Sequence, residues 1–278
     1  MSLQNGAAEA AAREDLGLPP RLTPTAEVRF VPPVGWIVEN SLGMRFTPVP
    51  GTQVQFSILE TRVQDFASFI NGTSYTANGG MGSLTPSGRQ EKGDTWRSPG
   101  FKQDESHPVC GVSWDDAKAF CAWLTKKERA AGRLVSNLEY RLPTQMEWEL
   151  AAGTVPPVAG VWPQVGAGNL AGSEVRDGNA PADFNFVPGY VDGFARTSPV
   201  GWFSSNAFGI YDLEGNVSEW CQPDGQVVAG NPVPTLGSSY ATAESETGGK
   251  EPRKAIAMPE MRHYSQGFRV VIAPTENK

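Results

Sequence analysis

The second half of the chain constrains the fold most, because more than 100 residues follow Gly153 without a sustained helical spacing of apolar residues. Glycine and proline, 31 and 23 of the 278 residues, mark frequent turns. The stretch "GFRVVIA", which begins at Gly267, is rich in β-branched and apolar residues and predicts a final strand. We therefore expect short strands joined by long loops in this half, rather than a helical bundle.

The first half supplies the regular elements. Two extended runs on either side of Pro50-Gly51 predict a β-hairpin, and "TRVQDFASFI" has the apolar spacing of a helix. Residues 72–106 are polar and glycine-rich, and they predict a long surface or functional loop.

Two main amphipathic helices follow, each announced by a capping residue. Ser113 with Asp116 predicts a helix that stops at Gly132, and Thr144 with Glu147 predicts another before Gly153. Helices followed by a turn-rich, stranded half are typical of an α+β protein. We expect residues 1–26 to be a linker or disordered N-terminus, and residues 27–278 to form a single domain.

Composition excludes several function classes. The net charge is −7 without a cluster of basic residues and aromatics, which argues against nucleic-acid binding. Three dispersed cysteines are too few for a disulfide framework, and the first residues lack the apolar core of a secretory leader. No run approaches the roughly 18 apolar residues of a membrane span. We expect a cytoplasmic protein that does not bind membranes.

The stretch "FGIYDLEGNVSEW", residues 208–220, places Asp212 and Glu219 seven residues apart around a Gly215-Asn216 turn. Such acids can bind a hard cation, form a catalytic pair, or simply lie in solvent on a turn. Calcium takes six to eight oxygens from carboxylates and backbone carbonyls, and Gly215 can adopt the sharp backbone that presents carbonyls. A catalytic pair has the weakest support, because no histidine or further acid with a fixed relation to them is visible.

Four motifs in one order carry a family resemblance. "HPVCGVSWDDAKAFCAWL", "YRLPTQMEWELAAG", "FGIYDLEGNVSEW" and "GFRVV" together resemble the formylglycine-generating enzymes, also called sulfatase-modifying factors. The resemblance implies a C-type-lectin-like fold with added loops. The family includes oxygen-dependent enzymes, sulfoxide synthases and non-enzymatic binders, among them variable products of diversity-generating retroelements. Function therefore has to be argued at the site.

The resemblance implies two structural calcium sites. One maps to the Asp212 and Glu219 side chains with the carbonyls of Gly215 and Val217. The other maps to the Asn169 and Asp192 side chains with the carbonyls of Leu170 and Phe194.

The family's catalytic step uses two cysteine thiolates on Cu(I), and the matching stretch here is "LGSSYATAESETGG". Thr242 and Thr247 occupy the two cysteine positions, and a hydroxyl is not a soft ligand, so we expect no copper. The histidine-bound iron of the sulfoxide synthases is not expected either, because the chain has only His107 and His263.

What remains is a loop surface between Ser238 and Gln266, a place where function often resides. The leading hypothesis is a non-catalytic, calcium-stabilised domain that binds a protein or peptide and is associated with a signalling or defence protein. The alternatives are a divergent oxidoreductase that acts at the same cleft, an architectural subunit of a larger assembly, and a solvated loop without a partner. The candidate ligand-binding residues are Tyr240, Thr242, Glu244, Thr247, Arg253, Arg262, His263 and Tyr264.

Overall fold

The computed structural model describes residues 39–91, 93–153, 163, 166–177, 180–226, 228–243 and 253–275. The predicted linker 1–26 lies outside this part of the chain. No helix among the described residues is long and apolar enough to cross a membrane.

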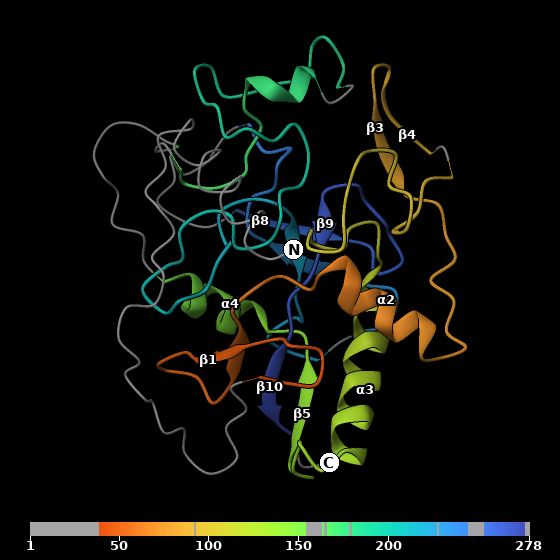
Figure 1. The fold of residues 1–278 in the computed structure, drawn as a ribbon, viewed down its shortest axis with the longest axis vertical. Coiled ribbons are helices and arrows are strands. Elements are labelled where there is room, and N and C mark those ends of the chain that lie inside the picture. Colours follow the sequence, from red (N-terminus) through yellow and green to blue (C-terminus); the bar gives the residue numbers. More distant parts are fainter. Residues whose placement is uncertain are drawn as a thin grey trace, which may run out of the picture.

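A four-stranded antiparallel sheet forms the lower half of the molecule (Figure 1). Its strands run in the order β1 (Phe46–Pro48), β2 (Gln55–Ser57), β10 (Val271–Pro274) and β5 (Leu138–Arg141). β1 and β2 pair as the predicted hairpin, and Gly51 in its turn has a φ of 84° that favours glycine. The predicted final strand is confirmed as β10, which inserts between β2 and β5 and so pairs with two segments far from it in the sequence.

Both main helices begin as predicted. In α3 (Trp114–Ala130), the Ser113 hydroxyl accepts from the backbone of Asp116, and Gly132 follows with a φ of 67°. In α4 (Gln145–Ala152), Thr144 and Glu147 form a capping box. These side chains satisfy amide groups that the first helical turn leaves without partners. A third helix, α2 (Val63–Asn71), packs against α3.

Helices cover the two faces of this sheet with two apolar clusters. Alternation along β10 divides them, because Ile272 joins the cluster under α2 and α3, while Val271 packs with Trp148 of α4. Phe66 and Phe120 stack within the first cluster. The sheet and its helices thus form a rigid base for the loops above.

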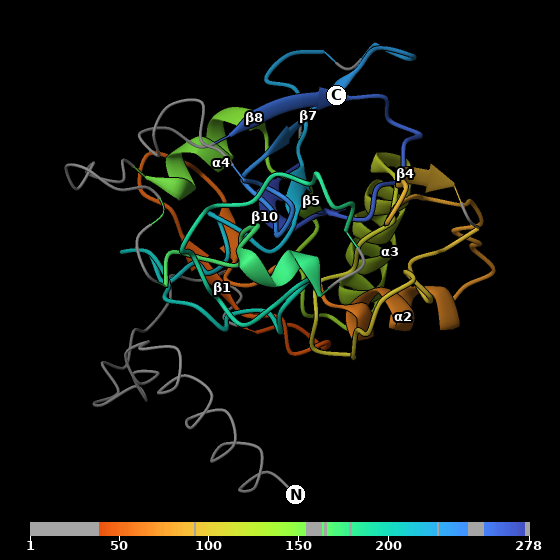
Figure 2. The same ribbon diagram turned by 90° about the horizontal axis from the view of Figure 1, so that it is seen from above.

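A second sheet contains β8 (Lys254–Ala257), β7 (Val233–Leu236), β6 (Ser218–Trp220) and β9 (Gln266–Gly267) in that order. The β7–β8 and β6–β7 pairs are antiparallel, and β6 and β9 are parallel. Figure 2 shows β7 and β8 on the side of the molecule opposite β1. The α+β prediction with short strands and long loops is confirmed, and the described loops also hold one 3-10 helix, η1 (Ser173–Arg176).

The predicted loop 72–106 contains an element that sequence reasoning missed. Residues Gly82–Thr85 (β3) and Gly88–Glu91 (β4) form a hairpin. Tyr264 donates from its backbone N to the Gly82 carbonyl at 3.1 Å, which ties the hairpin to the chain just before β9. Short polar strands without apolar alternation give little sequence signal, which explains the omission.

Candidate functional site

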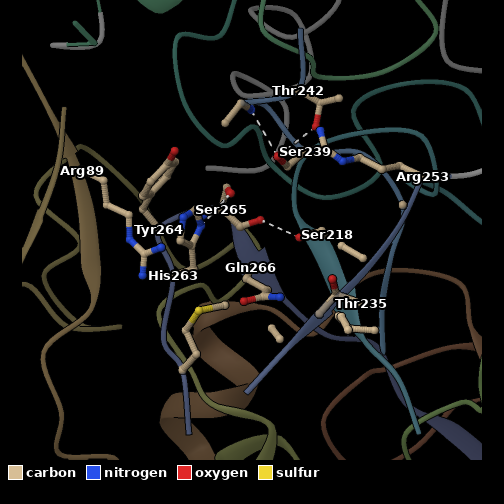
Figure 3. Close-up of a pocket in the computed structure, with 16 residues that line it drawn as sticks. Arg89, Ser218, Thr235, Ser239, Thr242, Arg253, His263, Tyr264, Ser265 and Gln266 are labelled. Carbon is tan, nitrogen blue, oxygen red and sulfur yellow. Dashed lines mark hydrogen bonds between the residues drawn. The ribbon is translucent and has the colours of Figure 1, made fainter. Parts of the chain in front are cut away.

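A pocket of about 250 Å³ lies over the second sheet (Figure 3). Residues of β6, β7 and β8 form part of its wall, together with the segments Gly237–Thr242 and Met261–Gln266. Arg89 reaches it from β4. The described residues of the segment between Ser238 and Gln266, which was expected to carry the function, therefore line a cavity.

The pocket wall is polar and carries positive charge. Arg89 and Arg253 line it on different sides in Figure 3, and the described lining contains no Asp or Glu, although the whole protein is acidic. Its hydroxyl groups come from Ser218, Thr235, Ser239, Thr242, Tyr264 and Ser265.

Local hydrogen bonds fix two of these groups. The Thr242 Oγ1 accepts from the backbone N of Ser239 at 2.9 Å, which closes a tight turn. His263 Nδ1 lies 3.0 Å from Ser265 Oγ. Burial, with a smaller effect from the Arg89 charge, lowers the pKa of His263 from 6.5 to about 4. The imidazole is therefore neutral at pH 7, and the positive charge comes from the arginines.

The predicted ligand-binding residues divide into three groups. Thr242, Arg253, His263 and Tyr264 line the pocket. Tyr240 does not; it is buried at 1% exposure, and its hydroxyl donates to the Tyr264 carbonyl at 3.1 Å. Arg262 also lies elsewhere, because its Nη2 forms an ion pair with Asp116 Oδ2 at 2.8 Å. The predicted Glu244 and Thr247 are outside the described residues.

Sequence reasoning missed Arg89 and Gln266. Arg89 lies more than 100 residues before the loop and reaches the pocket through the unpredicted hairpin. Gln266 is 4% exposed, and its Oε1 is buried with no hydrogen-bond partner in the described part of the chain. A buried polar atom of this kind can accept a hydrogen bond from a water molecule or a ligand.

The calcium site predicted at Asn169 and Asp192 has oxygens that suit a hard cation. Asn169 Oδ1 is buried and has no hydrogen-bond partner among the described residues, while its Nδ2 donates to the Arg196 carbonyl at 2.8 Å. Asp192 accepts from the backbone N of Leu170 at 2.8 Å and of Phe194 at 2.9 Å. Burial raises the pKa of Asp192 to about 7. Asn169 is next in the chain to Leu170, which contacts Asp192. The amide and carboxylate oxygens of Asn169 and Asp192 are of the types that calcium prefers.

The calcium site predicted at Asp212 and Glu219 is more crowded. Both carboxylate oxygens of Glu219 accept from Arg269, at 2.6 to 2.9 Å, and Oε2 also accepts from the Trp148 indole at 2.7 Å. Asp212 has a φ of 60° and accepts from the backbone N of Gly201. Glu219 is thus first of all the counter-ion of a fully buried arginine.

Glu60 is another buried acid near Asp212 and Glu219, and sequence reasoning missed it. Its carboxylate accepts from Asn216 Nδ2 at 2.8 Å and from the backbone N of Val217 at 3.2 Å. Burial raises its pKa well above normal, and the charges of Asp212 and Glu219 add to the effect. Nowhere in the described chain do three or more acid, His or Cys side chains gather to hold a metal. Calcium here would therefore depend on the carbonyls of Gly215 and Val217.

The two predicted calcium loops touch each other. A Cβ at Gly215 would lie 2.6 Å from the Asn169 carbonyl oxygen, so only glycine permits this approach. The Asn169 side chain also donates to Asn216 Oδ1 at 3.2 Å.

Both loops also brace the pocket. The Asn216 carbonyl accepts from the backbone N of Tyr240 at 3.0 Å, and Ala171 N donates to the Thr242 carbonyl at 3.1 Å. Both loops are therefore hydrogen-bonded directly to the segment Tyr240–Thr242 at the pocket.

The model of the family described as "Sulfatase-modifying factor enzyme 1-like domain" matches residues 37–274. The chain belongs to this family. The predicted resemblance is thereby confirmed, and the matched region begins ten residues after the predicted domain start at residue 27.

Curated relatives of this family member include proteins named as inactive formylglycine-generating enzymes and proteins named as formylglycine-generating enzymes. It is 31% identical over 192 residues to the inactive C-alpha-formylglycine-generating enzyme 2 of Bos taurus, which covers 63% of this chain and 54% of that protein. It is 36% identical over 135 residues to the formylglycine-generating enzyme of Mycobacterium tuberculosis, covering 46% and 39% of the two chains. The chain therefore spans only about half, or less, of the curated relatives it matches.

Solved structures confirm the fold. PvdO from Pseudomonas aeruginosa superposes with a TM-score of 0.54 at 21% identity, covering 83% of this chain and 91% of that one. Treponema denticola variable protein 1 gives a TM-score of 0.50 at 17% identity, covering 87% and 100%. At these identities the likeness establishes the formylglycine-generating-enzyme type of fold and nothing about activity.

The pocket of this sulfatase-modifying-factor-like domain does not suit Cu(I). Its described lining has no cysteine, and the Thr242 hydroxyl belongs to the turn with Ser239. The three cysteines are buried and free of disulfides. Burial raises the pKa of Cys110 to about 12 and that of Cys221 well above normal, which keeps both as thiols. Soft thiolate ligands are therefore missing from this part of the site.

Proposed function

We propose that the chain is a non-catalytic recognition domain, which binds a protein or peptide in the pocket between Ser238 and Gln266 and is stabilised by calcium. One observation carries the proposal: the family scaffold supports a formed polar pocket whose described lining lacks thiols. Binding without chemistry needs a shaped, rigid cavity with convergent polar groups, and no nucleophile.

The relatives support this assignment. Two of them are named as inactive enzymes, from Bos taurus and from Mus musculus, which is 37% identical over 150 residues. A segment of the serine/threonine-protein kinase Pkn1 of Chlamydia trachomatis is 32% identical over 124 residues, and the match covers 14% of that protein. A domain of this kind therefore can occur as a small part of a signalling protein, which supports the proposed association.

Calcium would support binding indirectly. The Asn169 and Gly215 loops hold the backbone of Tyr240 and Thr242, so a cation that fixes the loops also fixes the pocket wall. In this role the metal is structural and takes no part in chemistry.

Capture of random seven-residue peptides displayed on phage tests the proposal. We expect the purified domain in calcium buffer to enrich a peptide family. Ala255→Trp, which fills the pocket from the exposed strand β8, should reduce that capture by about tenfold or more. Ala122→Trp, at an exposed position of α3, is the matched control and should leave capture unchanged. Failure to enrich any peptide, or equal capture by the Ala255→Trp variant, would refute the proposed function.

A further inference from the structure

The two arginines of the pocket differ from several others in the protein. Arg141, Arg262 and Arg269 each form an ion pair with a carboxylate. Arg89 and Arg253 are exposed and form no ion pair in the described part of the chain. Two such guanidinium groups, in a pocket whose described lining has no carboxylate, leave positive charge for a ligand to neutralise.

The position of Arg89 is set by its neighbours. A Cβ at Gly82 would clash with the Arg89 Nε, so the absence of a side chain at Gly82 lets the guanidinium lie against the backbone. The Gly82 carbonyl in turn accepts from Tyr264 N, on the pocket wall. This hydrogen bond therefore holds the hairpin at the position from which Arg89 reaches the pocket.

The size of the cavity favours one side chain over a complete small molecule. Its volume of about 250 Å³ falls below the roughly 300–1,000 Å³ that is usual for small-molecule clefts. A second cavity of about 420 Å³ shares Ala241 and Arg253 with it and is lined by Asp183 and Phe184. Two cavities that share Arg253 in their linings suit an extended chain, which can place one side chain in each.

Gln266 supplies the polar contact that a peptide would use. Its Oε1 is a buried acceptor without a described partner, and a backbone N–H is a donor that every peptide residue except proline provides. A carboxylate can meanwhile accept two parallel hydrogen bonds from one arginine.

We infer that the two adjoining cavities bind an extended acidic peptide, with an Asp or Glu side chain in the pocket that Arg89 and Arg253 line and a backbone N–H donated to Gln266 Oε1. This inference rests on the proposed function and adds the chemical class of the partner.

The phage-display capture described above tests it when the enriched sequences are read for composition. We expect an excess of Asp and Glu at one position over the starting library. Arg89→Gln and Arg253→Gln should each weaken binding of a synthetic enriched peptide about tenfold, as loss of a charged hydrogen bond implies. Arg97→Gln is the matched control, because Arg97 is exposed and stacks on Trp96 away from the pocket. Gln266→Met should also weaken binding.

Charge reversal provides the sharpest check. The double variant Arg89→Glu, Arg253→Glu should enrich basic peptides from the same library and lose the acidic ones. Capture of apolar or basic peptides by the unchanged protein would overturn this inference and leave the proposed function standing. Capture of acidic peptides that is insensitive to Arg89→Gln and Arg253→Gln would also overturn it. No capture at all would remove the proposed function, and this inference with it.

Discussion

The Glu219→Gln substitution probes the ion pair between two buried side chains, Glu219 and Arg269. Arg269 is fully buried, and Glu219 accepts two hydrogen bonds from its Nε and one from its Nη2, besides one from Trp148. Gln keeps the size of the side chain but removes the charge and presents an N–H towards donors. Breaking a buried ion pair from one side costs about 3–5 kcal/mol, because the other charge remains buried without its partner.

We expect the loss to be near the lower end of this range. Glu60 and Asp212 also act on Arg269 electrostatically, so a part of the compensating charge survives the substitution. About 3 kcal/mol is a large share of the roughly 5–15 kcal/mol by which domains are stable. Urea denaturation in a chelating buffer measures the loss without any contribution from calcium.

The control and the calcium condition separate two roles of Glu219. Glu149→Gln removes one partner of the exposed Lys254 ion pair, and it should cost less than about 1 kcal/mol. If Glu219 is also a calcium ligand, its substitution costs more in calcium than in chelator. A loss below about 1 kcal/mol in chelator would show that the ion pair does not stabilise the fold as argued.

Three further predictions concern calcium, pH and thiols. A chelator should lower the thermal unfolding midpoint, since calcium at a hundredfold excess over Kd stabilises the folded state by about 2.7 kcal/mol. Asp192→Asn should reduce this sensitivity to the chelator in scanning calorimetry. An unchanged midpoint would remove calcium from the proposal. The pKa of His263 falls from 6.5 to about 4 on folding, so stability is full above pH 6.5 and is lost as pH falls towards 4. At most about 3 kcal/mol depends on this group, and His263→Gln should flatten that part of a urea stability profile; an equally steep profile would contradict the assignment. Cys110, Cys121 and Cys221 are buried, so Ellman's reagent should react with them only after unfolding, and rapid labelling of the native protein would show an accessible thiol.

The sequence predicted the elements whose signals are local. Ser113 and Thr144 marked the two helix starts, and the β-branched and apolar residues of "GFRVVIA" marked the final strand, because each of these signals is contained in a few adjacent residues. The segment that encloses the pocket was also found, through Thr242, Arg253, His263 and Tyr264.

What the sequence did not reveal depends on contacts between distant segments. Arg89 lies near His263 because Gly82, on the same hairpin, pairs with that segment. Arg262 lies outside the pocket because it forms an ion pair with Asp116 on α3. Glu60 lies 156 positions from the Asn216 side chain that it accepts from. The only local signal for Glu60 is a lone carboxylate in an apolar run, which does not identify a partner.

The family scaffold persists in this chain, and we propose that it does so without the family's copper chemistry. Mass spectrometry of a Cys-x-Pro-x-Arg peptide, incubated with the protein, Cu(I) and oxygen, tests this claim most directly. We expect the cysteine side chain to remain unchanged. An active formylglycine-generating enzyme, run as the positive control, should convert the same peptide fully. Turnover of the peptide cysteine to the aldehyde by this chain would contradict the proposal.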